Sequence, residues 1–100
     1  MLCVLTHRRL RPGSYDAFLA AWRPDDWWPG FEHGYHLRSL DDPDEVISFA
    51  FYDTTAEEFE RMRDDPQWIN AEDRRLQRLA PLQLSMRIGG VYEVAAEITR

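Results

Sequence analysis

The chain has 100 residues, the length of a typical single domain, and a formal net charge of -6 at pH 7. This acidity argues against nucleic acid or an anionic membrane as the partner, and no apolar run is long enough to span a bilayer. One cysteine cannot form an intramolecular disulfide, and the start of the chain lacks the pattern of a signal peptide. We therefore expect one domain, residues 1–100, in the cytoplasm.

The first quarter of the chain predicts a strand followed by a helix. Both alternating sets of residues 1–9 are mostly apolar, which is typical of a strand covered on both sides. The arginines at its end (Arg8, Arg9 and Arg11) are interpreted as solvated. Ser14 is a plausible N-cap for an amphipathic helix that Pro24 ends. The apolar residues at helical spacing are Tyr15, Phe18, Leu19 and Trp22.

A loop at 25–30 and a turn at 41–44 bracket a second predicted strand, 34–40, and residues 46–52 predict a third. The third strand is apolar on both faces, with Ile47, Phe49 and Phe51 forming the bulkier one. Thr55 and Glu58 form the pattern of a capping box, and Asp65-Pro66 is a second helix start. We expect one helical region in two pieces that ends at Pro81.

The C-terminal segment predicts one long strand, 82–98, whose even-numbered residues are mostly apolar. A two-residue hairpin at Gly89-Gly90 would break this pattern, so we interpret the glycines as a kink or bulge. A strand of that length spans roughly 56 Å, more than a domain of this size, so we expect its far half to reach a partner.

The predicted element order is strand, helix, strand, strand, helix, strand, which is the α+β ferredoxin-like βαββαβ sandwich. Two helices cover only one face of a four-stranded sheet, whereas the third strand is apolar on both faces. A second copy of the same sheet is the economical cover, so we predict a homodimer, a dimeric α/β barrel with the C-terminal strand in the interface.

In its element order, its Asp65-Pro66-Gln67-Trp68 helix start and its extended last strand, the chain resembles the antibiotic-biosynthesis-monooxygenase-like family. The resemblance covers nearly the whole chain. It implies a pocket between sheet and helices, with Trp68 at its wall and no bound cofactor. The side chains expected to line the substrate pocket are Phe18, Trp22, Trp28, Phe49, Phe59 and Met62.

The two candidate catalytic residues are His7 and Trp68. A neutral imidazole at His7 can accept a proton from a phenol or quinol, although a structural histidine would fit the same position. Trp68 can stack on an aromatic substrate or simply fill the core. His33 and His36 would point to opposite faces of a strand, so no metal site is expected.

Three functions remain open. The first is a cofactor-independent monooxygenase acting on a small aromatic molecule, such as a quinol or a polyketide. The alternative is a dimer that binds a small hydrophobic ligand without catalysis. Haem binding or degradation ranks third. Resemblance to the haem-degrading branch of the family would imply a histidine after the helix tryptophan, and the segment after Trp68 has none.

Overall fold

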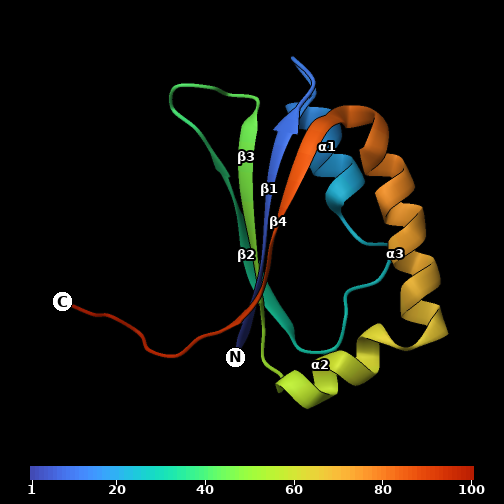
Figure 1. The fold of residues 1–100 in the computed structure, drawn as a ribbon, viewed down its shortest axis with the longest axis vertical. Helices are drawn as coiled ribbons and strands as arrows, with labels where there is room; N and C mark the ends of the chain where they lie inside the picture. The colour runs from blue at the N-terminus through green and yellow to red at the C-terminus, as the bar shows by residue number, and fades with distance from the viewer.

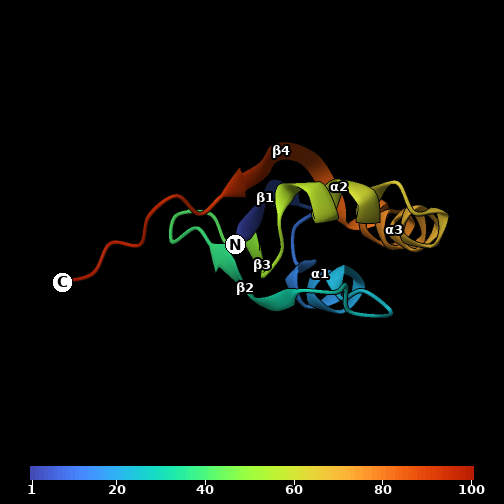
Figure 2. The same cartoon turned by 90° about the horizontal axis from the view of Figure 1, so that it is seen from below.

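The computed structural model describes the backbone of residues 1–100 and the side chains of all of them except Ile88. Its four strands form one antiparallel sheet in the order β2-β3-β1-β4. All three helices lie on one face of this sheet (Figures 1 and 2). The predicted α+β ferredoxin-like fold is therefore confirmed. The elements in chain order are β1 Leu2–Leu10, α1 Tyr15–Trp22, β2 Phe31–Arg38, β3 Glu45–Tyr52, α2 Ala56–Arg63, α3 Pro66–Leu79, the 3-10 turn η1 Ala80–Leu82 and β4 Gln83–Glu93.

The second helical region is divided as predicted, because each piece has its own N-cap. Thr55 Oγ1 accepts a hydrogen bond from the backbone N–H of Glu58 at 3.2 Å, which caps α2. Asp65 Oδ1 accepts one from the backbone N–H of Gln67 at 2.8 Å, with Pro66 as the first residue of α3. At α1, by contrast, Ser14 occupies the N-cap position without a side-chain hydrogen bond.

Strand β2 begins at Phe31, three residues before the predicted start, and it ends at Arg38. Gly30, with φ of 87°, turns the chain, and its carbonyl accepts a hydrogen bond from the backbone N–H of Asp53 at 2.7 Å. This contact pairs Phe31 with Tyr52 at the end of β3. The early start is thus fixed by a neighbour distant in sequence, which local patterns do not show.

The pairing register of β1 and β3 shows which of their residues face the helices. The pairs Val4–Ala50, Thr6–Ser48 and Arg8–Val46 share one face of the sheet. Val46, Ser48 and Ala50 are buried, whereas their neighbours on the other face are half-exposed. The smaller side chains of β3 therefore pack under the helices, and the bulkier ones lie on what we call the open face. The apolar and aromatic open-face residues of the four strands are Cys3, Leu5, Tyr35, Leu37, Ile47, Phe49, Phe51 and Tyr92.

A β-bulge interrupts β4 at its glycines, as predicted. Leu5 pairs with Gly90 and Thr6 pairs with Ile88, so Gly89 is the extra residue. A Cβ on Gly89 would overlap with Leu5 Cδ2, and Gly90 has φ of 99°, so both positions suit glycine. The extra residue reverses the alternation, and Tyr92 joins the open face. The predicted single even-numbered apolar face is therefore wrong beyond the bulge.

The predicted strand 82–98 is also too long. Strand β4 ends at Glu93, and the backbone N–H of Val94 makes a last hydrogen bond, 2.9 Å to the carbonyl of Met1. Residues 94–100 then leave the sheet and extend away from the domain (Figure 1).

The densest packing lies at one end of the molecule. Leu10, Phe18, Val46 and Leu79 form a cluster in which each residue is at most 1% exposed. The other end, where α2 and the start of α3 face the sheet, has no comparable cluster among the described side chains. None of the helices has the length and apolar character needed to cross a membrane within the described residues.

Candidate functional site

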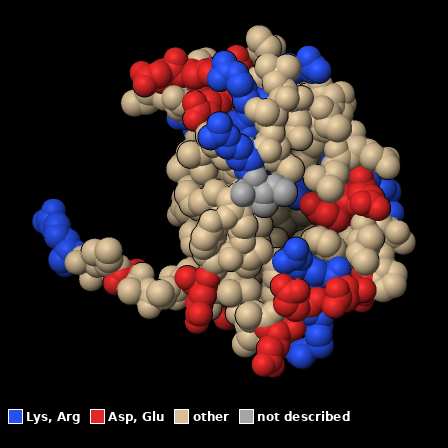
Figure 3. All heavy atoms as spheres, viewed as in Figure 1, with Lys and Arg blue, Asp and Glu red and all other residues tan. Residues whose placement is uncertain are grey.

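A cavity of about 650 Å³ lies between the sheet and the helices at this less densely packed end. Volumes of this size are typical of pockets for small molecules. Figure 3 shows a hollow near the centre of the molecule, with basic and acidic side chains at its rim. All four tryptophans of the chain line the cavity: Trp22, Trp27, Trp28 and Trp68.

Aromatic rings from different elements pack against each other around the cavity. The ring centroids of Trp28, in the loop before β2, and Trp68, in α3, are 5.7 Å apart. Tyr52 at the end of β3 packs edge-on against Phe59 of α2, with centroids 5.7 Å apart. Such tilted and edge-to-face contacts are favourable arrangements of aromatic rings. They place flat apolar surfaces on several sides of the cavity.

Trp68 also brings an unused hydrogen-bond donor to this site. Its indole Nε1 is buried and has no hydrogen-bond partner among the described residues. A buried donor without a partner costs about 1–3 kcal/mol.

The second notable polar group is Arg8, which is only 2% exposed although it lines the cavity. Its Nε donates to Gln83 Oε1 at 3.1 Å, and its Nη1 donates to Thr6 Oγ1 at 2.8 Å. Burial lowers the pKa of Arg8 to about 10, with the charge of Arg75 as a further cause, so the guanidinium is charged at neutral pH. The prediction that Arg8 is solvated is therefore wrong, because it lies on the helix-facing side of β1.

Arg75 and Glu72 form the charged part of the wall contributed by α3. Two hydrogen bonds join the guanidinium and the carboxylate, at 2.7 and 3.1 Å. Arg75 Nη1 also donates to the carbonyl of Trp22 at 3.1 Å, and Arg78 Nη2 donates to the carbonyl of Arg23 at 3.1 Å. The end of α1 is thus anchored to α3.

Two titratable groups on the helix-facing side are held in their neutral forms at pH 7. Burial raises the pKa of Tyr52, so its hydroxyl is protonated. Burial, together with the charges of Arg8 and Arg75, lowers the pKa of His36. The His36 ring lies behind Trp22, with centroids 4.6 Å apart, and its Nδ1 is 2.8 Å from Ser48 Oγ.

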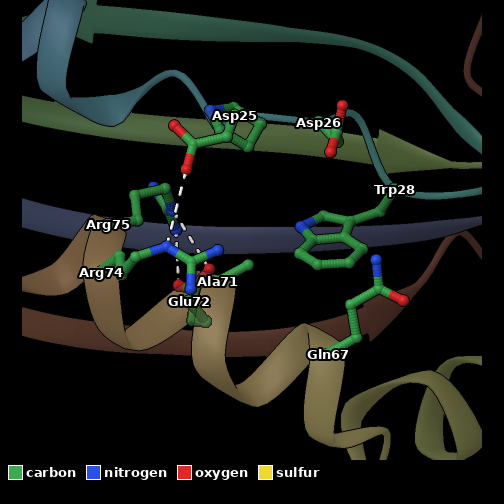
Figure 4. A pocket seen from close by; sticks show the side chains of 9 residues that line it. Asp25, Asp26, Trp28, Gln67, Ala71, Glu72, Arg74 and Arg75 are labelled. Carbon is green, nitrogen blue, oxygen red and sulfur yellow. Dashed lines mark hydrogen bonds and ion pairs between the residues drawn. The ribbon is translucent and has the colours of Figure 1, made fainter.

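A much smaller cavity of about 60 Å³ lies beside the main one, between the loop after α1 and α3. Figure 4 shows Trp28 and Gln67 at one side of it and the Arg75–Glu72 ion pair at the other. This volume holds one or two water molecules and is too small for an aromatic ring. The larger cavity is therefore the candidate site.

The structure brings five of the eight predicted site residues together around the cavity. These five are Trp22, Trp28, Phe59, Met62 and Trp68.

The other three lie elsewhere. Phe18 is fully buried in the core cluster, and Phe49 is on the open face. His7 is also on the open face, because odd-numbered residues of β1 point away from the helices, and its Nε2 is 2.9 Å from Glu45 Oε1. The prediction that His7 and Phe49 lie in the pocket is therefore wrong, because the alternation of β1 and β3 places both on the open face.

The sequence interpretation missed several lining residues, notably Thr6, Arg8, Glu72 and Arg75. One signal was available for Arg8, because it shares its alternating set with Leu2, Val4 and Leu10. For Arg75, the spacing from Trp68 of seven residues places both on one side of a helix.

No three His, Cys, Asp or Glu side chains are arranged to hold a metal ion in the part of the chain that the structure describes. His33 and His36 point to opposite faces of β2 as predicted, since His33 stacks on Phe51 and His36 contacts Phe18.

Comparison with solved structures identifies the class of fold. The chain is similar to SnoaB, a cofactor-independent oxygenase from Streptomyces nogalater, with 16% identity, coverage of 99% of this chain and 97% of that one, and a TM-score of 0.68. It is similar to a protein of Nitrosomonas europaea provisionally assigned as an antibiotic biosynthesis monooxygenase, with 16% identity, 96% and 100% coverage and a TM-score of 0.66. A NIPSNAP domain protein from Burkholderia xenovorans has 19% identity, 100% coverage of both chains and a TM-score of 0.59.

The chain therefore has the fold of the antibiotic-biosynthesis-monooxygenase-like proteins, over nearly its whole length, as the sequence resemblance implied. No protein-family profile matches the sequence, and no curated protein matches it. At identities of 16 to 19% the similarity establishes the fold, and the activity has to be argued from the site.

Proposed function

We propose that this protein is a cofactor-independent monooxygenase that acts on a small aromatic molecule, of the quinol or polyketide type, in the cavity between sheet and helices. The observation that carries the proposal is the convergence of all four tryptophans on one cavity of about 650 Å³. Flat aromatic walls suit a flat aromatic ligand. The fold shared with SnoaB, a cofactor-independent oxygenase, supports the same reaction class.

The proposed reaction needs only the substrate and molecular oxygen. A ring methylene of an anthrone loses a proton to water, the carbanion adds to oxygen to give a peroxide anion, and uptake of a proton by this anion gives a hydroperoxide. Loss of water from the resulting hydroperoxide leaves a carbonyl, so one oxygen atom enters the product and the other leaves as water. We assign Trp68 the role of hydrogen-bond donor to a substrate oxygen, because its indole N–H is buried without a partner. His7 is not part of this proposal, since it lies on the open face.

Oxygen uptake with an anthrone tests this proposal. We expect uptake above the protein-free rate, and a Trp68→Phe variant, which keeps the ring but removes the donor, should lower it about tenfold or more. Tyr15→Phe is the control, because it also removes one hydrogen-bond donor and keeps the ring, but Tyr15 packs against the core cluster outside the cavity, so its rate should stay near that of the unaltered protein. Uptake no faster than without protein, or equal rates for Trp68→Phe and the unaltered protein, would contradict the proposal.

A non-catalytic binding role is the second candidate, and the ion pairing of the cavity carboxylates favours it. Glu72 is held by Arg75 and Glu60 lies 3.4 Å from Arg63, so both are poorly placed to act as bases. Tryptophan fluorescence separates the two roles, since every indole of the chain borders the cavity. Quenching by an aromatic ligand without oxygen uptake would identify a binding protein.

We also propose that two copies pair through their open faces, with residues of β4 in the interface. Tyr35, Leu37 and Tyr92 are each about half exposed on a face that no helix of the same copy covers. Burial of such a face against its symmetry mate removes apolar surface from water without additional chain. Residues 94–100, which extend away from their own domain, would lie beside the second copy.

A further inference from the structure

Arg8 is a buried cation beside an apolar cavity, and a bound anion would stabilise it. Arg8 is 2% exposed, and both of its side-chain hydrogen bonds go to neutral groups, Gln83 and Thr6. Among the described residues, no carboxylate lies within ion-pair distance of its guanidinium. A charge removed from water is expensive unless it is paired, and here the side chain borders a cavity rather than solid packing.

The charged side chains that line the cavity also favour a negatively charged ligand. The described lining residues include three arginines and two glutamates, an excess of one positive charge in a chain whose net charge is -6. Both glutamates lie beside arginines of their own helices, at 3.4 Å for Glu60–Arg63 and 2.7 Å for Glu72–Arg75. The uncompensated positive charge is therefore that of Arg8.

The separation along α3 between Trp68 and Arg75, whose charge acts on Arg8, indicates the length available to a ligand. Arg8 lies where the cavity meets the core, since its guanidinium carbon is 5.6 Å from the ring centroid of Phe18. Along α3, Arg75 is on this side and Trp68 is seven residues earlier, an axial separation of about 10 Å. A molecule of two or three fused rings fits this length.

We propose that Arg8 is an anion-binding residue, and that the cavity takes an aromatic molecule with a negatively charged oxygen, a carboxylate or an ionised phenol, directed at its guanidinium. The apolar part of the ligand lies between Trp28, Trp68 and Phe59. This inference rests on the proposed function only in requiring that the cavity accepts an aromatic molecule, and it holds for either an enzyme or a binding protein.

Binding of 2-naphthoate and its neutral analogue 2-naphthamide, followed by tryptophan quenching at pH 7, tests the charge preference directly. We expect the unaltered protein to bind the carboxylate at least about tenfold more tightly than the amide, because charge-assisted hydrogen bonds to a buried cation are strong. In an Arg8→Gln variant the preference should disappear, with amide affinity nearly unchanged. Equal affinity of the unaltered protein for both probes would overturn the inference, and so would a preference that persists in Arg8→Gln.

The matched control is Arg9→Gln, the adjacent arginine on the open face, which pairs with Asp42 at the surface. It should keep the preference of the unaltered protein. If Arg8→Gln does not fold, Arg8→Lys replaces it, and the loss of the planar guanidinium should weaken the preference, whereas an unchanged preference in Arg8→Lys or equal affinity of the unaltered protein for both probes would overturn the inference. Failure of both probes to bind counts against the proposed function as well, whereas equal binding of both counts against the role of Arg8 alone.

A phenol probe separates the two anionic groups. The ionised form of 4-nitrophenol absorbs at a longer wavelength than the neutral form, so a pH titration gives its pKa when bound. If the cavity accepts phenolates, binding lowers this pKa in the unaltered protein and in Arg9→Gln but not in Arg8→Gln. Tight naphthoate binding with an unshifted 4-nitrophenol pKa would restrict the ligand to carboxylates, and the inference would stand in that narrower form.

Discussion

At the scale of single residues, Arg8 and His36 are two ionisable side chains on the helix-facing side of the sheet, where they lie among smaller polar residues such as Thr6 and Ser48. Their neighbours on that side of their own strands are Thr6 and Leu10 for Arg8, and Gly34 and Arg38 for His36. Arg8 is held by Thr6 and Gln83, and His36 by Ser48. Arg8 is buried and His36 is half-buried, and burial is the main cause of the shifted pKa of each, so each links stability to ionisation.

The lowered pKa of His36 predicts a loss of stability in acid. Burial is the main cause, followed by the charges of Arg8 and Arg75, and Phe18, Trp22 and Ser48 complete its surroundings. Its pKa is about 6.5 when unfolded and lower when folded, so the unfolded chain binds the proton first. The contribution of neutral His36 is complete above about pH 6.5 and is lost as the pH falls through the folded pKa.

We expect the unaltered protein to lose unfolding free energy more steeply than a His36→Gln variant as the pH falls below about 6.5. Each unit by which folding lowers a pKa is worth about 1.4 kcal/mol. Urea unfolding at several pH values measures the slope. The control is His33→Gln, which removes an exposed imidazole from the other face of β2 and should keep the original slope. Parallel curves for His36→Gln and the unaltered protein would count against this account.

At the scale of elements, the bulge in β4 decides what the strand contributes to each side of the sheet. Met86, before the bulge, and Val91, five residues later, both line the cavity, although a regular strand would place them on opposite faces. Tyr92 consequently reaches the open face beside Cys3. The space that a side chain at Gly89 would need is filled by Leu5.

The contact between Gly89 and Leu5 predicts a coupled effect on stability. Gly89→Ala should lower the free energy of unfolding by about 1–3 kcal/mol, because the new Cβ would overlap with Leu5 Cδ2. Leu5→Ala removes this overlap at the cost of its own packing. Urea unfolding of both single variants and of the double variant measures the coupling, and the double variant should lose less than the sum of the two. Additive losses would mean that the destabilisation by Gly89→Ala does not come from overlap with the Leu5 side chain.

The sequence predicted elements far better than the site, for a physical reason that β1 illustrates. Caps and prolines are local signals, so the starts of α2 and α3 at Ala56 and Pro66 could be read from neighbouring residues. Both alternating sets of β1 are largely apolar, and nothing local says which one the helices cover. For this reason the prediction placed His7 in the pocket and Arg8 in solvent, whereas the structure has Arg8 at the cavity and His7 on the open face. The phase reversal at Gly89 was equally invisible, since only pairing with Leu5 reveals which glycine is extra.

At the scale of the whole molecule, the sheet separates a helix-covered face from an open one that is largely apolar. Helices α1, α2 and α3 all lie on the same side, and residues 94–100 extend away from them (Figures 1 and 2). The open face has aromatic side chains from three strands, including Tyr35, Phe51 and Tyr92. Apolar surfaces of this kind mark interaction sites in soluble proteins.

Pairing of two open faces predicts a mass of about 24 kDa by light scattering at micromolar concentration, twice the 11.9 kDa of one chain. Leu37→Arg places a charge on the open face at a residue that is 46% exposed, so it should give folded monomers. Leu40→Arg is the matched control, because Leu40 is fully exposed in the turn between β2 and β3, and it should remain dimeric. A mass of 12 kDa for the unaltered protein would rule out the pairing.

The tight cluster of Leu10, Phe18, Val46 and Leu79 lies at one end of the domain, and the tryptophan-lined cavity lies at the other. Folding and ligand choice therefore depend on largely separate sets of side chains. We therefore expect replacements of Met62 or Val91, which line the cavity and lie outside that cluster, to change the shape of the molecule that fits more than they change the fold.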